Sequence, residues 1–312
     1  MVPIRPEAGR PRREHVRAIV LSGPISYAQA IILGLLQGFS ELFPISSLGH
    51  SVILPQLLGW DIHQNDAYFI TFLIATHLAT AIVLFLFFLK DWLRIFAGMW
   101  RSLVEREIAP DNTDGRLGWL LVVGTIPAGI LGLLLQDALR SVFASAQSAA
   151  FFLTLNGVLL YGAERLRRRA PVAESSDPQA SDLRIATTTS WRDALGIGGA
   201  QAIALIPGFS RSGASMGGGL LVGLSNEDAA RFSFLLATPI IGAAAALKLP
   251  DLFGATGDGV RGPALVASLC SALTAYLSVR FLVRYFETNR LTPFAIYCFV
   301  AGIACSIYFA VT

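Results

Sequence analysis

Long apolar runs divide the chain, and their lengths constrain the fold more than any other feature of the sequence. A helix needs about 20 apolar residues to cross a bilayer. Six runs are long enough or nearly so: 67–89, 117–136, 147–163, 230–249, 263–286 and 292–311. The shorter runs form two pairs, 26–43 with 45–59 and 192–207 with 212–224, each broken by Pro, Gly and Ser. We interpret each pair as a re-entrant hairpin, which enters and leaves a membrane on one side.

The composition agrees with an all-α polytopic membrane protein. The chain is 54% hydrophobic and 14% charged, with a mean hydropathy of +0.60, whereas an ordinary soluble domain is about 25% charged. A formal net charge of +3 is too small to indicate binding to nucleic acid. Cys270, Cys298 and Cys305 lie in apolar runs without metal-site spacing, so we interpret them as core residues. The sequence therefore predicts six transmembrane helices and two re-entrant helical hairpins.

The two broken pairs are related by a shift of 164 positions. This shift places Gly34 on Gly198 and Gln37 on Gln201. Further identities follow without a gap, with Ala30 on Ala194, Ser46 on Ser210, Gly49 on Gly213 and Ser51 on Ser215. Chance similarity between Gly- and Ser-rich apolar segments is the alternative explanation. If the similarity reflects a repeat, each half holds one hairpin and three spans, and because three is odd the second half is inverted.

Four parts of the chain follow from these patterns. They are a disordered tail (1–24), a first inverted repeat with its hairpin at 26–59 (25–163), a charged, solvent-exposed cytoplasmic linker (164–190) and a second inverted repeat with its hairpin at 192–224 (191–312).

The distribution of basic residues predicts the orientation. Cytoplasmic loops carry an excess of Lys and Arg, and the segments 90–116 and 164–190 together contain nine Arg and one Lys. With these segments in the cytoplasm, both termini and the mouth of the first hairpin face outward. The five arginines of the tail favour the opposite orientation.

Polar residues of the first hairpin gather around its break. Gln37 and Glu41 lie four residues apart and therefore share a helix face. A carboxylate at bilayer depth costs roughly 2.5–3.5 kcal/mol on insertion scales, so Glu41 needs a partner or a function. Both residues offer oxygen ligands for a hard divalent cation. His50 follows Ser46 and Ser47 by four and three residues, which makes a hydroxyl–imidazole pair an option. A poorly spanning helix with a chance Glu is the alternative.

The second hairpin places Arg211 at its break. A guanidinium suits phosphate oxygens, which it can bind with two parallel hydrogen bonds. A helix predicted to start near Ser212 would add free N–H groups and a positive dipole end. In the alternative interpretation, Arg211 only pairs with Glu41 and holds the two halves together. Together the two breaks indicate phosphate chemistry on a membrane-embedded substrate.

Both breaks resemble the motifs of the undecaprenyl-diphosphate phosphatase family, whose members confer bacitracin resistance. That family has an (E/Q)xxxE motif followed by PxSSxGH, matched here by 37–41 and 44–50, and a PGxSRSxxT motif, matched by 207–215. The likeness runs from about Ser26 onward and includes GTIPAGILGLLL at 124–135. Gln37 stands where many members have Glu, which removes one metal-binding charge. Ser215 replaces Thr and keeps the hydroxyl.

This resemblance implies an integral enzyme of the bacterial plasma membrane that converts undecaprenyl diphosphate to the monophosphate, the lipid carrier for peptidoglycan precursors. It also implies inverted repeats, an active site open to the outer face, and a divalent cation, Mg²⁺ or Ca²⁺. Expected partners are the polyprenyl diphosphate and membrane lipids, with a homodimer as one candidate assembly. The implied site comprises Glu41, Ser47, His50 and Arg211 as catalytic residues, Glu41 and Gln37 at the metal, and Gln37, Ser46, Ser210, Ser212, Gly213 and Ser215 around the substrate.

Three questions stay open at the level of sequence. The nucleophile is Ser47 assisted by His50, which we favour, or His50 itself, or an activated water. His77, a lone imidazole on the apolar run 67–89, fits a packing role better than a place in the site. A transporter or flippase for a polyprenyl phosphate or another anion is the alternative function, because broken helices aimed at an anion also occur in transporters.

Overall fold

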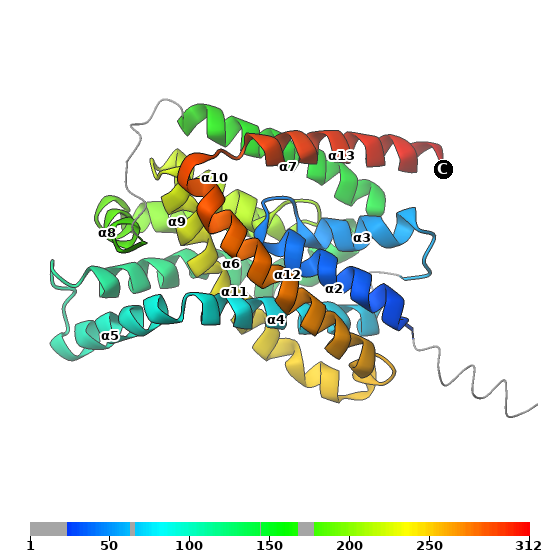
Figure 1. The fold of residues 1–312 in the computed structure, drawn as a ribbon, viewed down its shortest axis with the longest axis horizontal. Coiled ribbons are helices and arrows are strands. Elements are labelled where there is room, and N and C mark those ends of the chain that lie inside the picture. The colour runs from blue at the N-terminus through cyan, green and yellow to red at the C-terminus, as the bar shows by residue number, and fades with distance from the viewer. Residues whose placement is uncertain (1–23, 63–65, 144, 168–177) are drawn as a thin grey trace, which may run out of the picture.

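The structure is a computed structural model that describes residues 24–62, 66–143, 145–167 and 178–312. Over these ranges it is entirely helical, with twelve α-helices, two short 3₁₀ helices and no strand (Figure 1). The α-helices are α2 (Tyr27–Leu42), α3 (Ser47–Leu57), α4 (Ala67–Phe87), α5 (Leu89–Glu105), α6 (Thr113–Phe143), α7 (Ala146–Arg167), α8 (Pro178–Thr188), α9 (Trp191–Ala202), α10 (Arg211–Leu221), α11 (Asn226–Phe253), α12 (Arg261–Thr288) and α13 (Thr292–Val311), and the 3₁₀ helices are η1 (Ile203–Leu205) and η2 (Ala255–Gly257).

In the described part of the chain, six helices are long and apolar enough to cross a membrane. They are α4, α6 over Thr113–Leu135, α7, α11, α12 and α13. These helices match the six predicted spans, three on each side of the linker, so the prediction of a multi-pass all-helical membrane protein is confirmed.

Both predicted breaks are present in the structure. Phe43 precedes a proline and has extended backbone (φ −67°, ψ 142°), which ends α2. Ser46 then caps α3. In the second segment α9 continues into η1, Pro207 follows, and Ser210 caps α10. Figure 1 shows α2 and α3 folding back along each other, with the break inside the molecule and their outer ends near the C-terminus.

Each broken segment packs on a spanning helix of the other half. The helix α2 lies against α12, and α9 lies against α6. Glycines permit both contacts, because a Cβ on Gly34 would collide with the backbone of Ala267, and a Cβ on Gly198 would collide with the carbonyl of Gly124. The spans follow the same rule, since α4 contacts α12 and α11 contacts α6. The two halves are therefore interlocked.

Two segments differ from the exposed loops that the sequence predicted. The segment 90–116 contains most of α5, which buries Trp92 and Ile95. The linker 164–190 contains the end of α7 and all of α8, where Ser181 and Asp182 are buried. Asp182 binds the guanidinium of Arg231 on α11 at 2.6 and 2.9 Å. The charged composition of the linker 164–190 thus reflects internal ion pairs as well as contact with water. The tail 1–23 and the segment 168–177 lie outside the described residues.

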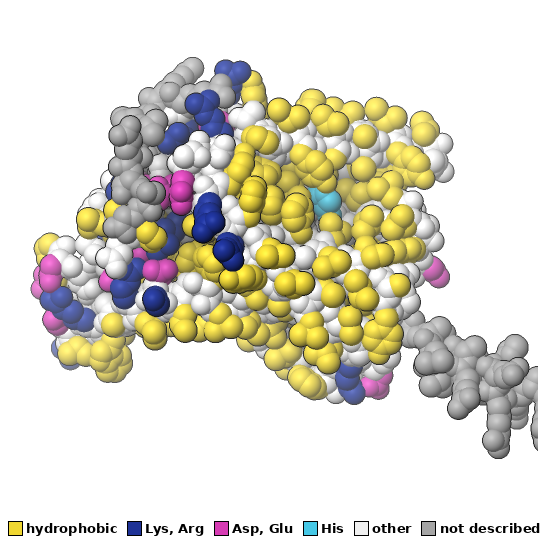
Figure 2. Space-filling model, in the orientation of Figure 1, with side chains coloured by type: hydrophobic (Ala, Val, Ile, Leu, Met, Phe, Trp, Pro, Cys, Tyr) yellow, Lys and Arg dark blue, Asp and Glu magenta, His cyan; other side chains and the backbone are white. Residues whose placement is uncertain are grey.

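Charged side chains concentrate at one end of the molecule. Figure 2 shows most Lys and Arg of the visible face at the end that contains α5, α8, the end of α7 and the last turns of α12, while hydrophobic side chains predominate over the rest of this face. The beginning of α2 and the C-terminus lie at the opposite end (Figure 1). The positive-inside rule predicts orientation from such an unequal distribution of Lys and Arg between the two ends of a membrane protein.

Candidate active site

The two breaks meet inside the molecule. A Cβ built on Gly49, in the first turn of α3, would lie 3.0 Å from Cα of Gly208 in the second break, and a Cβ on Gly213 would lie 3.3 Å from Cβ of Pro44. Gly208 has a φ of +106°, which L side chains rarely adopt. The helices α3 and α10 therefore begin beside each other, so their free N–H groups and positive dipole ends are neighbours.

Glu41 is the centre of the contacts at this junction. Its Oε1 accepts hydrogen bonds from Arg211 Nη2 at 3.0 Å and Nε at 3.3 Å. Its Oε2 accepts from the hydroxyl of Ser47 at 2.5 Å and from Gln37 Nε2 at 3.0 Å. Every partner donates to Glu41, as an ionised carboxylate requires. The structure thus brings together four of the predicted residues, Gln37, Glu41, Ser47 and Arg211.

His77 also belongs to this junction, although the sequence favoured a packing role. Its Nε2 lies 3.3 Å from Glu41 Oε2, and its Nδ1 lies 2.7 Å from the carbonyl oxygen of Leu73. A carbonyl only accepts, so Nδ1 carries a hydrogen, and the contact with Glu41 is attractive when Nε2 carries one too. The only sequence signal was an imidazole in an apolar helix, and nothing local related it to a residue 36 positions earlier.

His50 has partners other than the serine hydroxyls. Its Nδ1 lies 2.6 Å from the carbonyl oxygen of Ser46, and its Nε2 lies 2.8 Å from the hydroxyl of Tyr297 on α13. Because Nδ1 must donate to the carbonyl, a neutral His50 accepts from Tyr297 through Nε2. The hydroxyl–imidazole pair expected from the spacing is not formed in this structure, since Ser47 donates to Glu41 instead.

The serines of the second break make internal hydrogen bonds. Ser210 Oγ accepts from the N–H of Gly213 and lies 3.0 Å from Ser212 Oγ. Ser212 Oγ also donates to the carbonyl of Phe43, which joins α10 to the end of α2. Ser215 Oγ lies 2.6 Å from Ser233 Oγ on α11. All three predicted serines are buried. Their substrate contacts stay predictions, and the arrangement gives them a clear role in holding the break in place.

Asn156 on α7 links the two breaks, and the sequence analysis missed it. Its Nδ2 donates to the carbonyl of Pro44 at 3.0 Å, and its Oδ1 accepts from the N–H of Ser210 at 3.1 Å. The side chain is fully buried. Ser46 adds local strain, since it has a φ of +70° although it is not a glycine. Asn156 therefore stabilises the irregular backbone on which the candidate site is built.

We expect Asn156→Ala to lower the free energy of unfolding by about 2–4 kcal/mol, because it leaves a buried carbonyl and a buried N–H without partners. The measurement is the midpoint of thermal unfolding in detergent. Val158→Ala on the exposed side of the same helix is the control. Equal midpoints for the two variants would show that Asn156 does not support the breaks.

The junction provides oxygen ligands for a divalent cation, but not a complete set. Gln37 Oε1 is buried and has no hydrogen-bond partner among the described residues, and Glu41 is adjacent. The part of the chain that the structure describes has no group of three or more His, Cys, Asp or Glu suited to a metal. These residues fit a hard cation whose remaining ligands come from a phosphate group and water.

Comparison with known proteins identifies the family. A family model described as "Bacitracin resistance protein BacA" matches residues 30–304. The chain belongs to this family. Relatives named undecaprenyl-diphosphatase, from Mycolicibacterium paratuberculosis and Mycobacterium avium, are each 48% identical over 306 residues, which cover 93% of this chain and 99% of the relative. A relative from Frankia alni, named undecaprenyl-diphosphatase 2, is 42% identical over 341 residues, covering 92% of this chain and 99% of the relative.

The match to the BacA family covers the whole junction. Both breaks lie within residues 30–304, and so do His77, Asn156 and Tyr297, which complete the contacts around them. The matched range 30–304 therefore contains both the family motifs and the residues that position them.

Proposed function

We propose that this protein is an undecaprenyl-diphosphatase, a membrane hydrolase that converts undecaprenyl diphosphate to undecaprenyl phosphate and inorganic phosphate. The product is the lipid carrier used in peptidoglycan synthesis. Membership of the BacA family and the names of the relatives support this function. The structural observation that carries it is Arg211, whose Nη1 is buried without a hydrogen-bond partner among the described residues, beside the hydrogen-bonded pair of Glu41 and Ser47.

The terminal phosphate binds between Arg211 and the beginnings of α3 and α10. Arg211 Nη1 is available to it, and the first N–H groups of the two helices add donors. Glu41 carries one negative charge, whereas Arg211 and a protonated His77 carry two positive charges. The resulting net positive charge at the junction favours binding of an anion. Gln37 and His77 position Glu41 by donating to Oε2.

Ser47 is the nucleophile in the mechanism that this geometry supports best. Its Oγ attacks the terminal phosphorus and its proton passes to Glu41, 2.5 Å away. The Oγ–P bond forms, and the bond from phosphorus to the bridging oxygen breaks, which releases undecaprenyl phosphate. Water then attacks the phosphorus of the phosphoserine and gives one proton to solvent, a P–O bond to the water oxygen forms, and the Oγ–P bond breaks. Ser47 Oγ takes back the proton held by Glu41, and inorganic phosphate leaves.

His50 has a supporting role in this mechanism. Its contacts with Ser46 and Tyr297 fix the first turn of α3, in which Ser47 lies. A His50 phosphoenzyme would first require Nε2 to leave Tyr297. The positions of these groups therefore favour Glu41 over His50 as the proton acceptor for Ser47.

A divalent cation, Mg²⁺ or Ca²⁺, completes the proposed site. Glu41 and Gln37 Oε1 would hold it together with diphosphate oxygens, and it would neutralise charge on the leaving group. With a single protein carboxylate, its affinity should depend on the substrate.

The finer architecture is also part of this proposal. We infer that α2–α3 and α9–α10 are re-entrant hairpins of two inverted repeats. The reciprocal packing of α2 on α12 and α9 on α6 supports this inference. The charged end of the molecule lies in the cytoplasm and the mouth of the first hairpin faces outward, in a bacterial inner membrane. A homodimer stays a prediction.

The test is hydrolysis by the purified full chain. In detergent with Mg²⁺ or Ca²⁺, we expect it to release phosphate from a polyprenyl diphosphate, and we expect a chelator to stop the release. Phosphate is measured colorimetrically, and activity should return when the metal is restored. Undiminished phosphate release with chelator would contradict the requirement for a cation. No phosphate release under any condition would contradict the hydrolase function.

Proteoliposomes distinguish the transporter alternative. A flippase would move a labelled polyprenyl phosphate across the bilayer without releasing inorganic phosphate. Intact spheroplasts test the orientation, because a short-chain substrate added outside should be hydrolysed if the site opens outward.

A further inference from the structure

The last turns of α12 contain two exposed arginines outside the candidate active site. Arg280 and Arg284 lie four residues apart and therefore on one helix face. Over the described ranges, neither has an ion-pair partner. By contrast, Arg94, Arg184 and Arg231 all pair with acidic side chains. Arg280 and Arg284 thus present two positive charges that the described protein does not neutralise.

The exposed face of α12 changes from apolar to basic along its length. Leucines at four-residue spacing occupy this face up to the arginines, and they are more than half exposed: Leu265, Leu269, Leu273 and Leu277. In a membrane these side chains contact acyl chains. Arg280 and Arg284 then lie about 12 and 6 Å from the end of the helix at Thr288, given a rise of 1.5 Å per residue. We place this part of α12 at the boundary between acyl chains and headgroups, because the exposed apolar face of the helix ends there.

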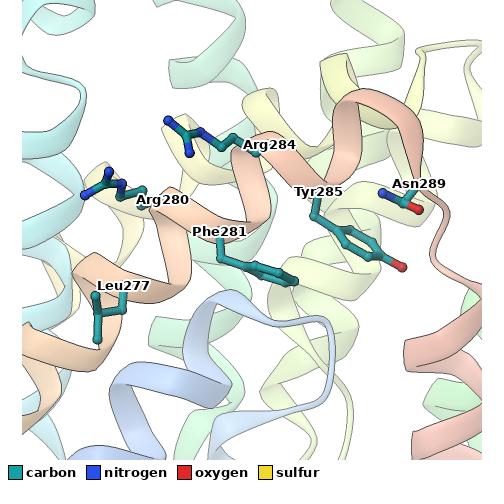
Figure 3. Close-up of a pocket in the computed structure, with 6 residues that line it drawn as sticks. All are labelled: Leu277, Arg280, Phe281, Arg284, Tyr285 and Asn289. Carbon is teal, nitrogen blue, oxygen red and sulfur yellow. The ribbon is translucent and has the colours of Figure 1, made fainter.

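A shallow groove connects the arginines to aromatic side chains. It has a volume of about 420 Å³ and is lined by Leu277, Arg280, Phe281, Arg284, Tyr285 and Asn289. Figure 3 shows both guanidinium groups extending in one direction from α12, with the rings of Phe281 and Tyr285 on the other side of the helix in this view. Tyr285 donates its hydroxyl to the carbonyl of Arg290, which fixes the ring beside the groove. Tyrosine is typical of the membrane interface.

We propose that this groove binds the headgroup of an anionic phospholipid from the cytoplasmic leaflet. The two guanidinium groups hold the phosphate with parallel hydrogen bonds. The acyl chains lie along Phe281 and the leucines of α12. The charge and position of the groove match an anionic lipid headgroup, and the neighbouring apolar side chains of α12 match its acyl chains. A free phosphate would make no contact with these apolar side chains. The choice of leaflet rests on the orientation proposed above, but lipid binding does not depend on the diphosphatase function, because the groove lies outside the junction of the two breaks.

The test counts lipids bound to the full chain. The protein is reconstituted in nanodiscs of phosphatidylglycerol and phosphatidylcholine, released, and measured by native mass spectrometry. We expect Arg280→Gln/Arg284→Gln to lose one bound phosphatidylglycerol and to weaken its apparent affinity on the order of 10-fold. Lys90→Gln/Arg106→Gln removes the same charge from exposed positions elsewhere and should retain the lipid.

A second pair of variants keeps the charge. Arg280→Lys/Arg284→Lys preserves both positive charges but removes the planar donors, so we expect affinity between those of the wild type and the Gln pair. Because its charge is unchanged, this pair also provides the test if the Gln pair unfolds. Retention equal to wild type in both pairs, equal loss in the Lys90/Arg106 control, or displacement of the lipid by millimolar inorganic phosphate would overturn the proposal.

Discussion

Glu41→Gln should reduce the turnover of polyprenyl diphosphate on the order of 10³-fold. The amide cannot accept the proton of Ser47, and it no longer balances the charge of Arg211, 3.0 Å away. The measurement is phosphate release by the purified variant at saturating substrate. The midpoint of thermal unfolding should also fall. Arg211 is part-buried, so the loss should lie below the cost of about 3–5 kcal/mol for breaking a fully buried ion pair.

Two further variants make this result interpretable. Glu41→Asp keeps the charge but shortens the side chain, so we expect it to recover most of the lost stability while turnover stays low. Glu105→Gln, in an exposed pair with Arg101 on α5, should leave turnover unchanged. Turnover near that of wild type in Glu41→Gln would remove Glu41 from the chemistry and leave it as a link between the two breaks.

Ser47→Ala should abolish formation of a phosphoenzyme and lower turnover by about 10³–10⁵-fold. The proposed covalent bond forms on the Ser47 oxygen, and alanine has no substitute for it. The protein is mixed with substrate labelled on the terminal phosphorus, quenched in denaturant at neutral pH, where both phosphoserine and phosphohistidine survive, and digested. The label should appear on the peptide that contains Ser47 in the wild type and should be absent in the variant.

Ser40→Ala is the matched control for this experiment. Ser40 is a buried serine on α2 whose hydroxyl donates to the carbonyl of Leu36, away from Glu41. It should keep both the label and the turnover. Label on His50 would indicate a histidine nucleophile, whereas turnover without any trapped label in wild type would favour direct attack by water.

The spans and breaks could be predicted because local sequence determines them. A run such as 292–311 is long enough to cross a membrane by itself. Pro44 favours extended backbone at Phe43, which ends α2. The contact between Glu41 and Arg211 could also be predicted from the sequence. Each is a charged residue at a break in an apolar segment, and neither is stable at that depth without a partner.

The remaining contacts of the site depend on how helices far apart in sequence pack. The rotation of α4 decides whether His77 faces Glu41 or lipid, and the apolar run around it gives no sign of that rotation. The same holds for Asn156 and Tyr297, which reach the breaks from α7 and α13. The helix α8 was hidden for another reason, because Asp182 looks solvated in sequence and is paired with Arg231 in three dimensions.

The reciprocal contacts between the two halves limit how substrate can reach the centre of the molecule. Alternating access would require one half to swing against the other, yet Gly34 touches Ala267 and Gly198 touches Gly124 with no space even for a methyl group. Such a swing would separate backbones in direct van der Waals contact at both places. We therefore expect the two halves to keep a fixed arrangement. The prenyl tail of the substrate then stays among the surrounding acyl chains, and only its diphosphate headgroup enters laterally between helices.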